Sequence, residues 1–502
     1  MQITRYKSRY FMLLCAMLCL LCGKKPKESA QEEILAQIGD RTVSVKEFQY
    51  RSEFTPRPQF PAKDKQETKK ILLNNYMLEK MFAIEAGDNN RLIKSDVFQR
   101  YIRGIKEQAM RERLFYRKAF DAVKLDTSEI MKVYKLAGRE YDVEFFTIHR
   151  DDLAEQIKSK IEANPDSADF IFNSLWDSDQ RPKQTVKYKD PDHIDIHESL
   201  FTKPVEPGTI IGPLKLEQNN HIIMRVVDWR FIPAISGEDQ QLRLNEVTEK
   251  MTLNRATRMW QQYQRDVMKG KQIEFEPATF EKLAEHFYKL RVAQNLEEKK
   301  ELQQKFWDME RDDATLDDLD NKEAILDLPF FTEDGKTWTV RDFRDALLSH
   351  PLVYRKQEIA RNEFRYQFQM AIADLVRDGY LDKDAYKEGL DKSPQVKRTT
   401  QMWKDALVAV NYRDEIIKTL GDKRRSLQDT TTSLNVYFDN YLLDLYHKYE
   451  KKIHIDEEKL NDISLTSVSM FAMQPGAPYP MVVPNFPIFT TQVELDTARN
   501  KE

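Results

Sequence analysis

Cysteine is confined to one end of this chain of 502 residues. Cys15, Cys19 and Cys22 lie within the first 22 residues, and the rest of the sequence contains no cysteine. The body of the protein therefore cannot form disulfides or thiolate metal sites.

Glycine is also scarce, with 14 residues in the chain, which is about 3% against a usual share of ~7%. A glycine-poor sequence rich in helix-forming residues favours a mostly helical protein and disfavours glycine-rich phosphate loops. The motifs GxxxxGK(S/T), GxGxxG, HExxH and GxSxG are absent. The sequence therefore gives no support for nucleotide hydrolysis, zincin proteolysis or α/β-hydrolase chemistry, and we expect no cofactor. A net charge of −4 gives no general attraction to nucleic acid.

The N-terminus has the features of an export signal. Three basic residues within the first nine precede an apolar run from Phe11 to Leu21, which is too short to span a bilayer. Polar sequence begins directly after Cys22, as in bacterial lipoprotein signals, and this resemblance implies lipidation of Cys22. Leu21 stands where a small residue usually precedes the cysteine, so an ordinary signal peptide cleaved slightly later stays open. Both alternatives imply export.

Two stretches of the body are predicted to start alike. Each of these stretches, residues 40–48 (DRTVSVKEF) and 335–343 (GKTWTVRDF), comes after a predicted short strand. Within each stretch we expect a turn, a second short strand and the capped start of a helix. In the first copy, we expect Ser44 to cap the helix and Glu47 to reach back to it. The repeat predicts two related helical modules, although short strings can also match by chance.

Between them lies a region of different texture. Residues 141–148 and 221–228 alternate as strands, with a helix at 151–163 and an irregular polar stretch at 177–198. The fold class is therefore α+β and predominantly helical, with a small α/β domain inserted in the first of the two modules. The expected parts are a signal peptide (1–22), a tether (23–33), an N-terminal helical module (34–138), the α/β domain (139–235), a helix and strand completing the first module (236–294), a charged linker helix (295–328), a second helical module (329–463) and a Pro/Met-rich tail (464–502).

One pair of histidines could be read as a metal site. If residues 192–198 (DHIDIHE) formed a strand, His193, Asp195 and His197 would share one face. The stretch is polar, and a solvated loop is the better interpretation. We therefore expect no metal.

The order of these parts resembles the SurA/PrsA type of extracytoplasmic foldase, in which a helical chaperone domain surrounds a parvulin-type prolyl isomerase domain. The resemblance covers residues 34 to about 283. It is clearest in IGDRTVSVKEF at 38–48 and in the segments GTIIGPL at 208–214 and NHIIMRVVD at 220–228. The segments at 208–214 and 220–228 look like the closing part of parvulins.

The parvulin site is degenerate in this comparison. His221 matches the family's second histidine, whereas Phe145 stands at the position of the first. Phe201 is a candidate for the proline-pocket aromatic. The glycine-rich rim is missing, because residues 177–192 contain no glycine. An isomerase needs an apolar pocket that holds the ring and twists a bond whose barrier is about 18–20 kcal/mol.

The resemblance implies an exported, lipid-anchored chaperone that binds unfolded or outer-membrane client proteins in the periplasm, with a parvulin-like domain that is weak or inactive. Which bacterial membrane holds the anchor stays open. An active peptidyl-prolyl cis-trans isomerase is the first alternative, and a structural lipoprotein that binds one fixed partner is the second. Nucleic acid is not an expected partner.

Lipidation can be tested on the mature protein. We expect the mature N-terminus to be an acylated Cys22, because this cysteine lies between the apolar run and the polar sequence that follows it. Two or more acyl chains, at about 0.8 kcal/mol per buried CH₂, would anchor the protein firmly. Mass spectrometry of the N-terminal peptide checks this. An unmodified peptide that starts after residue 22 would refute it.

Overall fold

The computed structural model describes residues 33–55, 60, 62–175, 181–217, 220–305, 325–356, 359–428, 432–466 and 482–493. The chain divides into two compact units. The terminal unit comprises the described residues of Met1–Lys94, Met402–Ala472 and Val482–Glu502, and the central unit comprises those of Ser95–Gln401.

Helices make up most of the described chain, and its three sheets are small and antiparallel. This confirms the predicted α+β, predominantly helical class. No helix within the described ranges is long and apolar enough to cross a membrane. The predicted signal peptide, with Cys22, lies outside the described residues.

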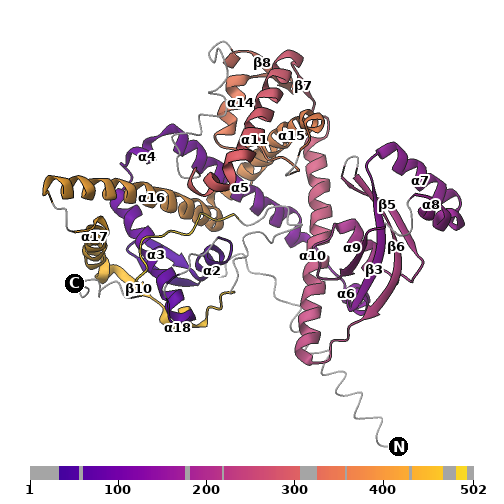
Figure 1. Ribbon diagram of the computed structural model, residues 1–502, viewed down its shortest axis with the longest axis horizontal. Coiled ribbons are helices and arrows are strands. Elements are labelled where there is room, and N and C mark those ends of the chain that lie inside the picture. Colours follow the sequence, from indigo (N-terminus) through magenta and orange to yellow (C-terminus); the bar gives the residue numbers. More distant parts are fainter. Residues whose placement is uncertain are drawn as a thin grey trace, which may run out of the picture. The chain divides into compact units, whose positions relative to one another are not determined.

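A three-stranded sheet brings distant parts of the chain together in the terminal unit. β1 (Ile34–Ile38) and β2 (Arg41–Ser44) form a hairpin, and Gly39 in its turn has a φ of 59°, which glycine adopts most readily. β10 (Ile453–Ile455) pairs with the other edge of β1, giving the order β10-β1-β2. The remaining elements are α2 (Val45–Glu53), α3 (Lys65–Ala86), α4 (Arg91–Lys94), the second part of α16 (Pro394–Ser426), α17 (Leu434–Tyr449), η5 (Glu450–Lys452) and α18 (Glu457–Asp462) (Figure 1).

A buried charge network links the helices of this unit. Arg51 donates from both terminal nitrogens to the two carboxylate oxygens of Glu79, at 2.6 and 2.8 Å. Lys80 Nζ lies 3.1 Å from Glu47 Oε1 and 3.2 Å from Asp405 Oδ2 on α16. Burial raises the pKa of Glu47. Burial lowers the pKa of Lys80, but its carboxylate neighbours raise it by more, so the pKa lies above its ordinary value.

This network changes one predicted contact. Ser44 caps α2 as expected, since its hydroxyl accepts from the Glu47 backbone N–H at 3.1 Å. The Glu47 carboxylate binds Lys80 and does not make the predicted return contact to the cap within the described structure. A buried carboxylate is stabilised more by a cation than by a neutral backbone N–H.

A four-stranded antiparallel sheet of order β4-β3-β6-β5 lies in the part of the central unit where the α/β domain is predicted. Its strands are β3 (Arg139–Ile148), β4 (Lys183–Lys187), β5 (Ile210–Glu217) and β6 (Asn220–Phe231). One face is covered by α7 (Asp151–Ala163) and α8 (Ala168–Leu175), and the other by α6 (Thr127–Leu136), α9 (Ile194–Phe201) and α10 (Gly237–Met268) (Figure 1). Short 3-10 turns lie at η1 (Phe120–Ala122) and η2 (Pro165–Ser167).

The stretch at 177–198 is more regular than predicted. It contains β4 and the first half of α9. β4 is an edge strand with a single fully buried side chain, Val186, so its sequence lacks a strong alternation of apolar and polar residues. Pairing with β3, rather than local pattern, determines this strand.

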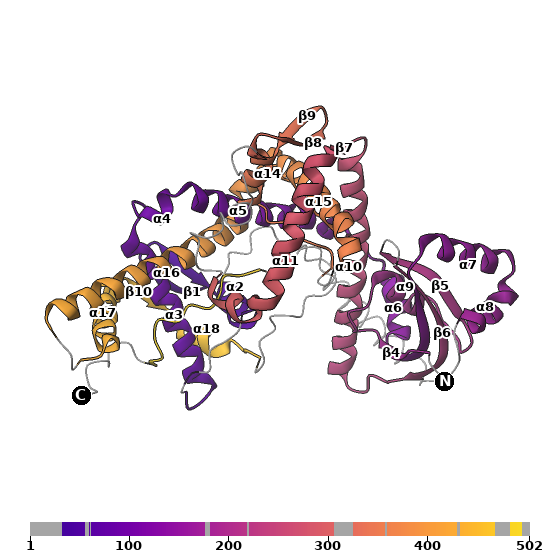
Figure 2. The same cartoon turned by 45° about the horizontal axis from the view of Figure 1, so that its top comes forward.

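The rest of the central unit contains a second three-stranded sheet, of order β7-β8-β9 (Figure 2). β8 (Pro329–Glu333) and β9 (Lys336–Thr339) form a hairpin, and β7 (Ile273–Phe275) pairs with the other edge of β8. α14 (Val340–Leu347) follows β9, and its cap is the full reciprocal box between Thr339 and Asp342. The other elements are α5 (Asp96–Lys118), α11 (Pro277–Lys305), α15 (Arg361–Lys387), η4 (Leu390–Lys392) and the first part of α16.

The strand partners differ from the prediction. Residues 273–275 were assigned to the first module, and 453–455 to the second, yet β7 completes the hairpin at 329–339 and β10 completes the hairpin at 34–44. The local sequence of a three-residue strand does not specify which of the two hairpins it joins. Tertiary packing makes this choice. The two sheets have the same arrangement, in which a short strand pairs with the first strand of a hairpin that leads into a capped helix. The division of the chain into two related modules stays a prediction.

A close contact in the central unit depends on one glycine. A Cβ built on Gly104 of α5 would lie 1.8 Å from the backbone oxygen of Ser349, just after α14. The helix can approach that backbone only because residue 104 has no side chain.

Substitution of this glycine tests the packing. We expect Gly104→Ala to lower the free energy of unfolding by about 1–3 kcal/mol, because overpacking forces the two segments apart. Gly379→Ala on α15 is the matched control. Its added Cβ would meet nothing within 4 Å, so it should be neutral or stabilise the helix by up to about 1 kcal/mol. Urea unfolding of the signal-free chain compares the two, and equal effects would contradict this contact.

Candidate functional site

His221 lies on β6, directly opposite Ile148 of β3 and Lys215 of β5. Its side chain is buried, and its Nε2 lies 3.6 Å from Asp151 Oδ1 at the start of α7. Its Nδ1 has no hydrogen-bond partner among the described residues. Ile148 packs with the apolar residues of α7 and α8, so His221 belongs to that face of the sheet.

Phe145 and Phe201 belong to the opposite face. Phe145 is paired with Met224 and packs with the core beneath α9 and α10. Phe201 is only 1% exposed, and its ring lies 5.3 Å from that of Tyr141 and 5.2 Å from that of Tyr188. A ring enclosed in this way fills the core and is not open to a substrate proline.

The sheet therefore separates the three residues that the family resemblance groups together. His221 faces one layer of helices, and the two phenylalanines face the other. The described structure does not assemble these side chains into one pocket.

On the same face of the sheet as His221, polar groups form an ion-pair cluster that sequence reasoning did not identify. Glu144 accepts from Arg225 at 2.8 Å and from Arg181 at 3.4 Å. Arg225 also donates to Asp169 of α8 at 3.1 Å, and both guanidinium groups lie about 5 Å from the Phe172 ring, at 4.9 and 5.2 Å. The hydrogen bond from Arg225 is the main cause that lowers the pKa of Glu144. Its carboxylate is thus fully engaged in holding α8 on the sheet and is a poor general base.

The histidine pair at 193–197 lies on a helix instead of the predicted solvated loop. His193 is the N-cap of α9 and accepts from the Asp195 N–H at 3.3 Å. His197 is buried, and its Nε2 donates to the Tyr188 carbonyl at 3.0 Å. Burial lowers the pKa of His197 to about 4, so it is a neutral core residue. No group of three or more ligating side chains with metal-site geometry occurs in the described ranges.

A cleft of about 420 Å³ lies elsewhere in the central unit, between α5, the β9–α14 segment and α15. Cations and anions line it together, with Trp338 and Tyr386 as its aromatic members. The charged residues are Arg100, Arg103, Lys336, Lys383, Glu107, Asp342, Asp345 and Asp382. A balanced mixture of this kind selects no single charge class of ligand.

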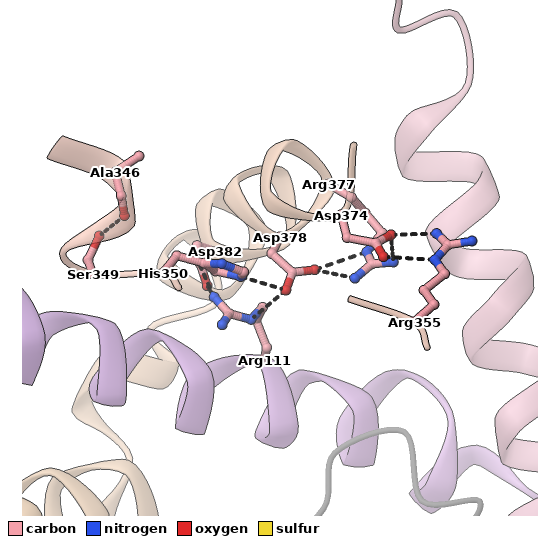
Figure 3. Close-up of polar contacts among 9 residues, drawn as sticks. All are labelled: Arg111, Ala346, Ser349, His350, Arg355, Asp374, Arg377, Asp378 and Asp382. Atoms are coloured by element: carbon pink, nitrogen blue, oxygen red, sulfur yellow. Dashed lines mark hydrogen bonds and ion pairs between the residues drawn. The ribbon is translucent and has the colours of Figure 1, made fainter. Parts of the chain in front are cut away.

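Asp382, which lines this cleft, belongs to a chain of ion pairs along α15 (Figure 3). Arg111 Nη1 donates to both oxygens of Asp382 at 2.9 and 2.8 Å, and its Nε lies 3.5 Å from Asp378 Oδ2. His350 donates to Asp378 at 2.9 Å, and Arg377 donates to it at 2.9 and 2.7 Å.

The two carboxylates of this chain have opposite pKa shifts. Burial raises the pKa of Asp378, but the hydrogen bond from His350 and the charges of Arg377 and Arg111 lower it to about 2. Burial raises the pKa of Asp382 to about 6, because Arg111 only partly offsets it and Glu107 adds to it. Asp378 is therefore a structural anion that joins α5 to α15, whereas the pKa of Asp382, which lines the cleft, lies above its ordinary value.

No known protein family matches the chain, and no curated protein does. The geometry of the described residues is therefore the basis of the functional argument.

Prolyl isomerase activity can be tested on the signal-free chain. We expect a rate on a Xaa-Pro peptide close to the uncatalysed one, which takes tens to hundreds of seconds, because His221 and Phe201 face different layers. His221→Ala should leave that rate unchanged. The matched control is His149→Ala, whose side chain is exposed next to β3. Efficient turnover that falls in the His221 variant alone would establish the enzyme instead.

Proposed function

We propose that this protein is an exported, lipid-anchored chaperone of the SurA/PrsA type, which holds unfolded client proteins in the periplasm and whose parvulin-like domain does not act as an efficient isomerase. The observation that carries the proposal is a strip of exposed apolar side chains where β6 leads into α10. We call Phe231, Ile232, Ile235 and Leu242 the apolar strip.

These side chains are exposed although they lie in an ordered part of the fold. Ile235 is 83% exposed and Leu242 is 57% exposed. Arg243 Nη2 donates to the Ile232 carbonyl at 2.8 Å, and the Ile232 N–H donates to the Gly138 carbonyl at 2.8 Å. The backbone of the strip is therefore held in place while its side chains point to solvent. Grouped exposed apolar residues are typical of surfaces that bind other apolar chains.

Arg243 adds a second feature of such a surface. Its guanidinium lies 5.9 Å from the centre of the Phe231 ring. A cation beside an exposed aromatic ring contacts both apolar and acidic parts of a client, so the strip accepts varied sequences. This suits a holding chaperone, which binds many clients without nucleotide or cofactor.

The alternatives have less support from the described residues. An isomerase needs the residues at 145, 201 and 221 on one pocket, and they lie on two faces of a sheet. A structural lipoprotein with one fixed partner would also use an apolar surface, and the number of bound clients distinguishes it.

Holding is tested by the aggregation of a denatured outer-membrane-type β-barrel protein. We expect the signal-free chain to slow aggregation at an equimolar ratio. Ile235→Asp combined with Leu242→Asp should remove most of this effect, because charge in the strip opposes apolar contact. Both side chains are exposed, so folding should change by less than about 0.5 kcal/mol per site.

The matched control is Phe170→Asp on α8, where an apolar ring is 76% exposed outside the strip. It should slow aggregation as well as the unaltered chain does. If the unaltered chain neither slows aggregation nor binds unfolded clients, the chaperone proposal fails. A pull-down that recovers one stoichiometric protein would then favour the fixed partner.

A further inference from the structure

The C-terminal residues 482–493 lie in the terminal unit without helix or strand. We call this sequence, VVPNFPIFTTQV, the docked segment. It belongs to the Pro/Met-rich tail at 464–502. Phe486, Pro487, Phe489 and Thr490 are buried, and Ile488 between the two pairs is 52% exposed. Much of the segment is therefore packed against the terminal unit.

The terminal unit binds the docked segment through its main chain. Asn75 of α3 is fully buried, and its Oδ1 accepts from the N–H groups of Phe489 and Thr490 at 2.6 and 3.0 Å. Its Nδ2 donates to the Thr490 carbonyl at 2.9 Å. One amide side chain thus satisfies three backbone groups of the segment.

Two neighbouring side chains make the same kind of contact. Asn74 Nδ2 donates to the carbonyls of Gln492 and Val493, at 3.1 and 2.9 Å. Arg51, from the buried charge network, donates to the Asn485 carbonyl at 3.0 Å. Contacts of this type fix the path of a bound chain but do not depend on its side chains.

Two aromatic pockets supply the side-chain contacts. The Phe486 ring meets Tyr76 edge-on at 5.1 Å, and the Phe489 ring stacks on Phe82 at 4.8 Å. The pockets are three residues apart in the segment, and Pro487 between them fixes one backbone angle and lowers the entropy lost on docking. Main-chain clamps combined with pockets for spaced side chains are the general design of a peptide-binding groove.

We propose that this groove on α3 is a peptide site, occupied by the docked segment and open to an extended client segment with two aromatic residues three positions apart. The inference deepens the proposed function, since it rests on the binding of unfolded chains and names where one of them binds. A segment of the same chain competes at an effective concentration in the millimolar range. Client segments therefore enter only when they are abundant or bind tightly.

The test uses a fluorescent peptide of residues 482–493 and the full signal-free chain. Fluorescence anisotropy should show weak binding to the unaltered chain. Phe486→Ala combined with Phe489→Ala in the chain loosens the docked segment and should tighten peptide binding at least about tenfold, because the internal competitor is weakened. Adding Asn75→Leu should abolish the gain. Ile488→Ala is the matched control, and it should behave as the unaltered chain does.

Hydrogen exchange of the unaltered chain gives a second measurement that does not depend on the folding of variants. Excess peptide should speed exchange at the amides of Phe489 and Thr490, since displacement frees them from Asn75. A peptide with both phenylalanines replaced by alanine should not. Two results would contradict the proposed peptide site. One is unchanged hydrogen exchange of these amides at saturating peptide, and the other is a gain in peptide affinity that persists after Asn75→Leu is added.

The outcome can be separated from that of the aggregation test. A chain that slows aggregation without exchanging its docked segment keeps the chaperone function and loses the groove. A chain that binds the peptide but does not slow aggregation keeps the groove and loses the holding function.

Discussion

The pairing of β10 with β1 is the constraint on which the terminal unit depends. It joins residues 34–38 to residues 453–455, so the unit exists only when the chain has returned from the central unit. Such a long-range pairing carries a large loop-closure cost. The contacts around it compensate, above all the charge network that fixes Asp405 of α16 to Lys80 of α3. Removing one partner of a buried ion pair typically costs about 3–5 kcal/mol, because the other is left uncompensated.

The same returning chain completes the surface of α3. Lys69 donates to three carbonyls at the end of α18, those of Leu460, Asn461 and Ile463, at 2.9, 2.9 and 3.0 Å. α3 therefore receives, in order along its length, the end of α18, the docked segment and the charge network. Each of these uses a buried polar side chain with directed hydrogen bonds, which specify position more sharply than apolar contact does. In the proposed groove, Asn75 and Arg51 are buried and hydrogen-bonded to the docked segment.

The α/β part of the central unit does not bring the residues at 145, 201 and 221 into one pocket. Its sheet, its two helical layers and its ion pairs around Glu144 are complete. His221 and Phe201 are both buried, but they serve different cores. The apolar strip lies where β6 leads into α10, and it is the surface through which the proposed function would act. A holding role needs an ordered scaffold with exposed apolar groups, and it needs no reactive side chain.

Local pattern in the sequence determined much of the fold. The helix at Asp151–Ala163 has the bounds that its sequence predicts, and the helical class follows from the scarcity of glycine. These features depend on neighbours within a few residues, which a sequence displays directly. Alternation along β3 and β6 also showed which residues of one strand share a face. The alternation could not show which residue of β3 pairs with which residue of β6, because the register between distant strands is set by packing.

Tertiary structure decided everything that joins distant residues. The partners of β7 and β10, the burial of His197 and the place of Phe201 in a core all depend on which surfaces meet. Three-residue strands carry too little local information to choose a hairpin. The docked segment is the extreme case, since its own sequence indicates only an irregular chain. Its conformation comes from Asn75, which lies more than 400 positions away at 2.6 Å from the Phe489 nitrogen. Contacts between residues so far apart in sequence leave no local pattern from which they could be predicted.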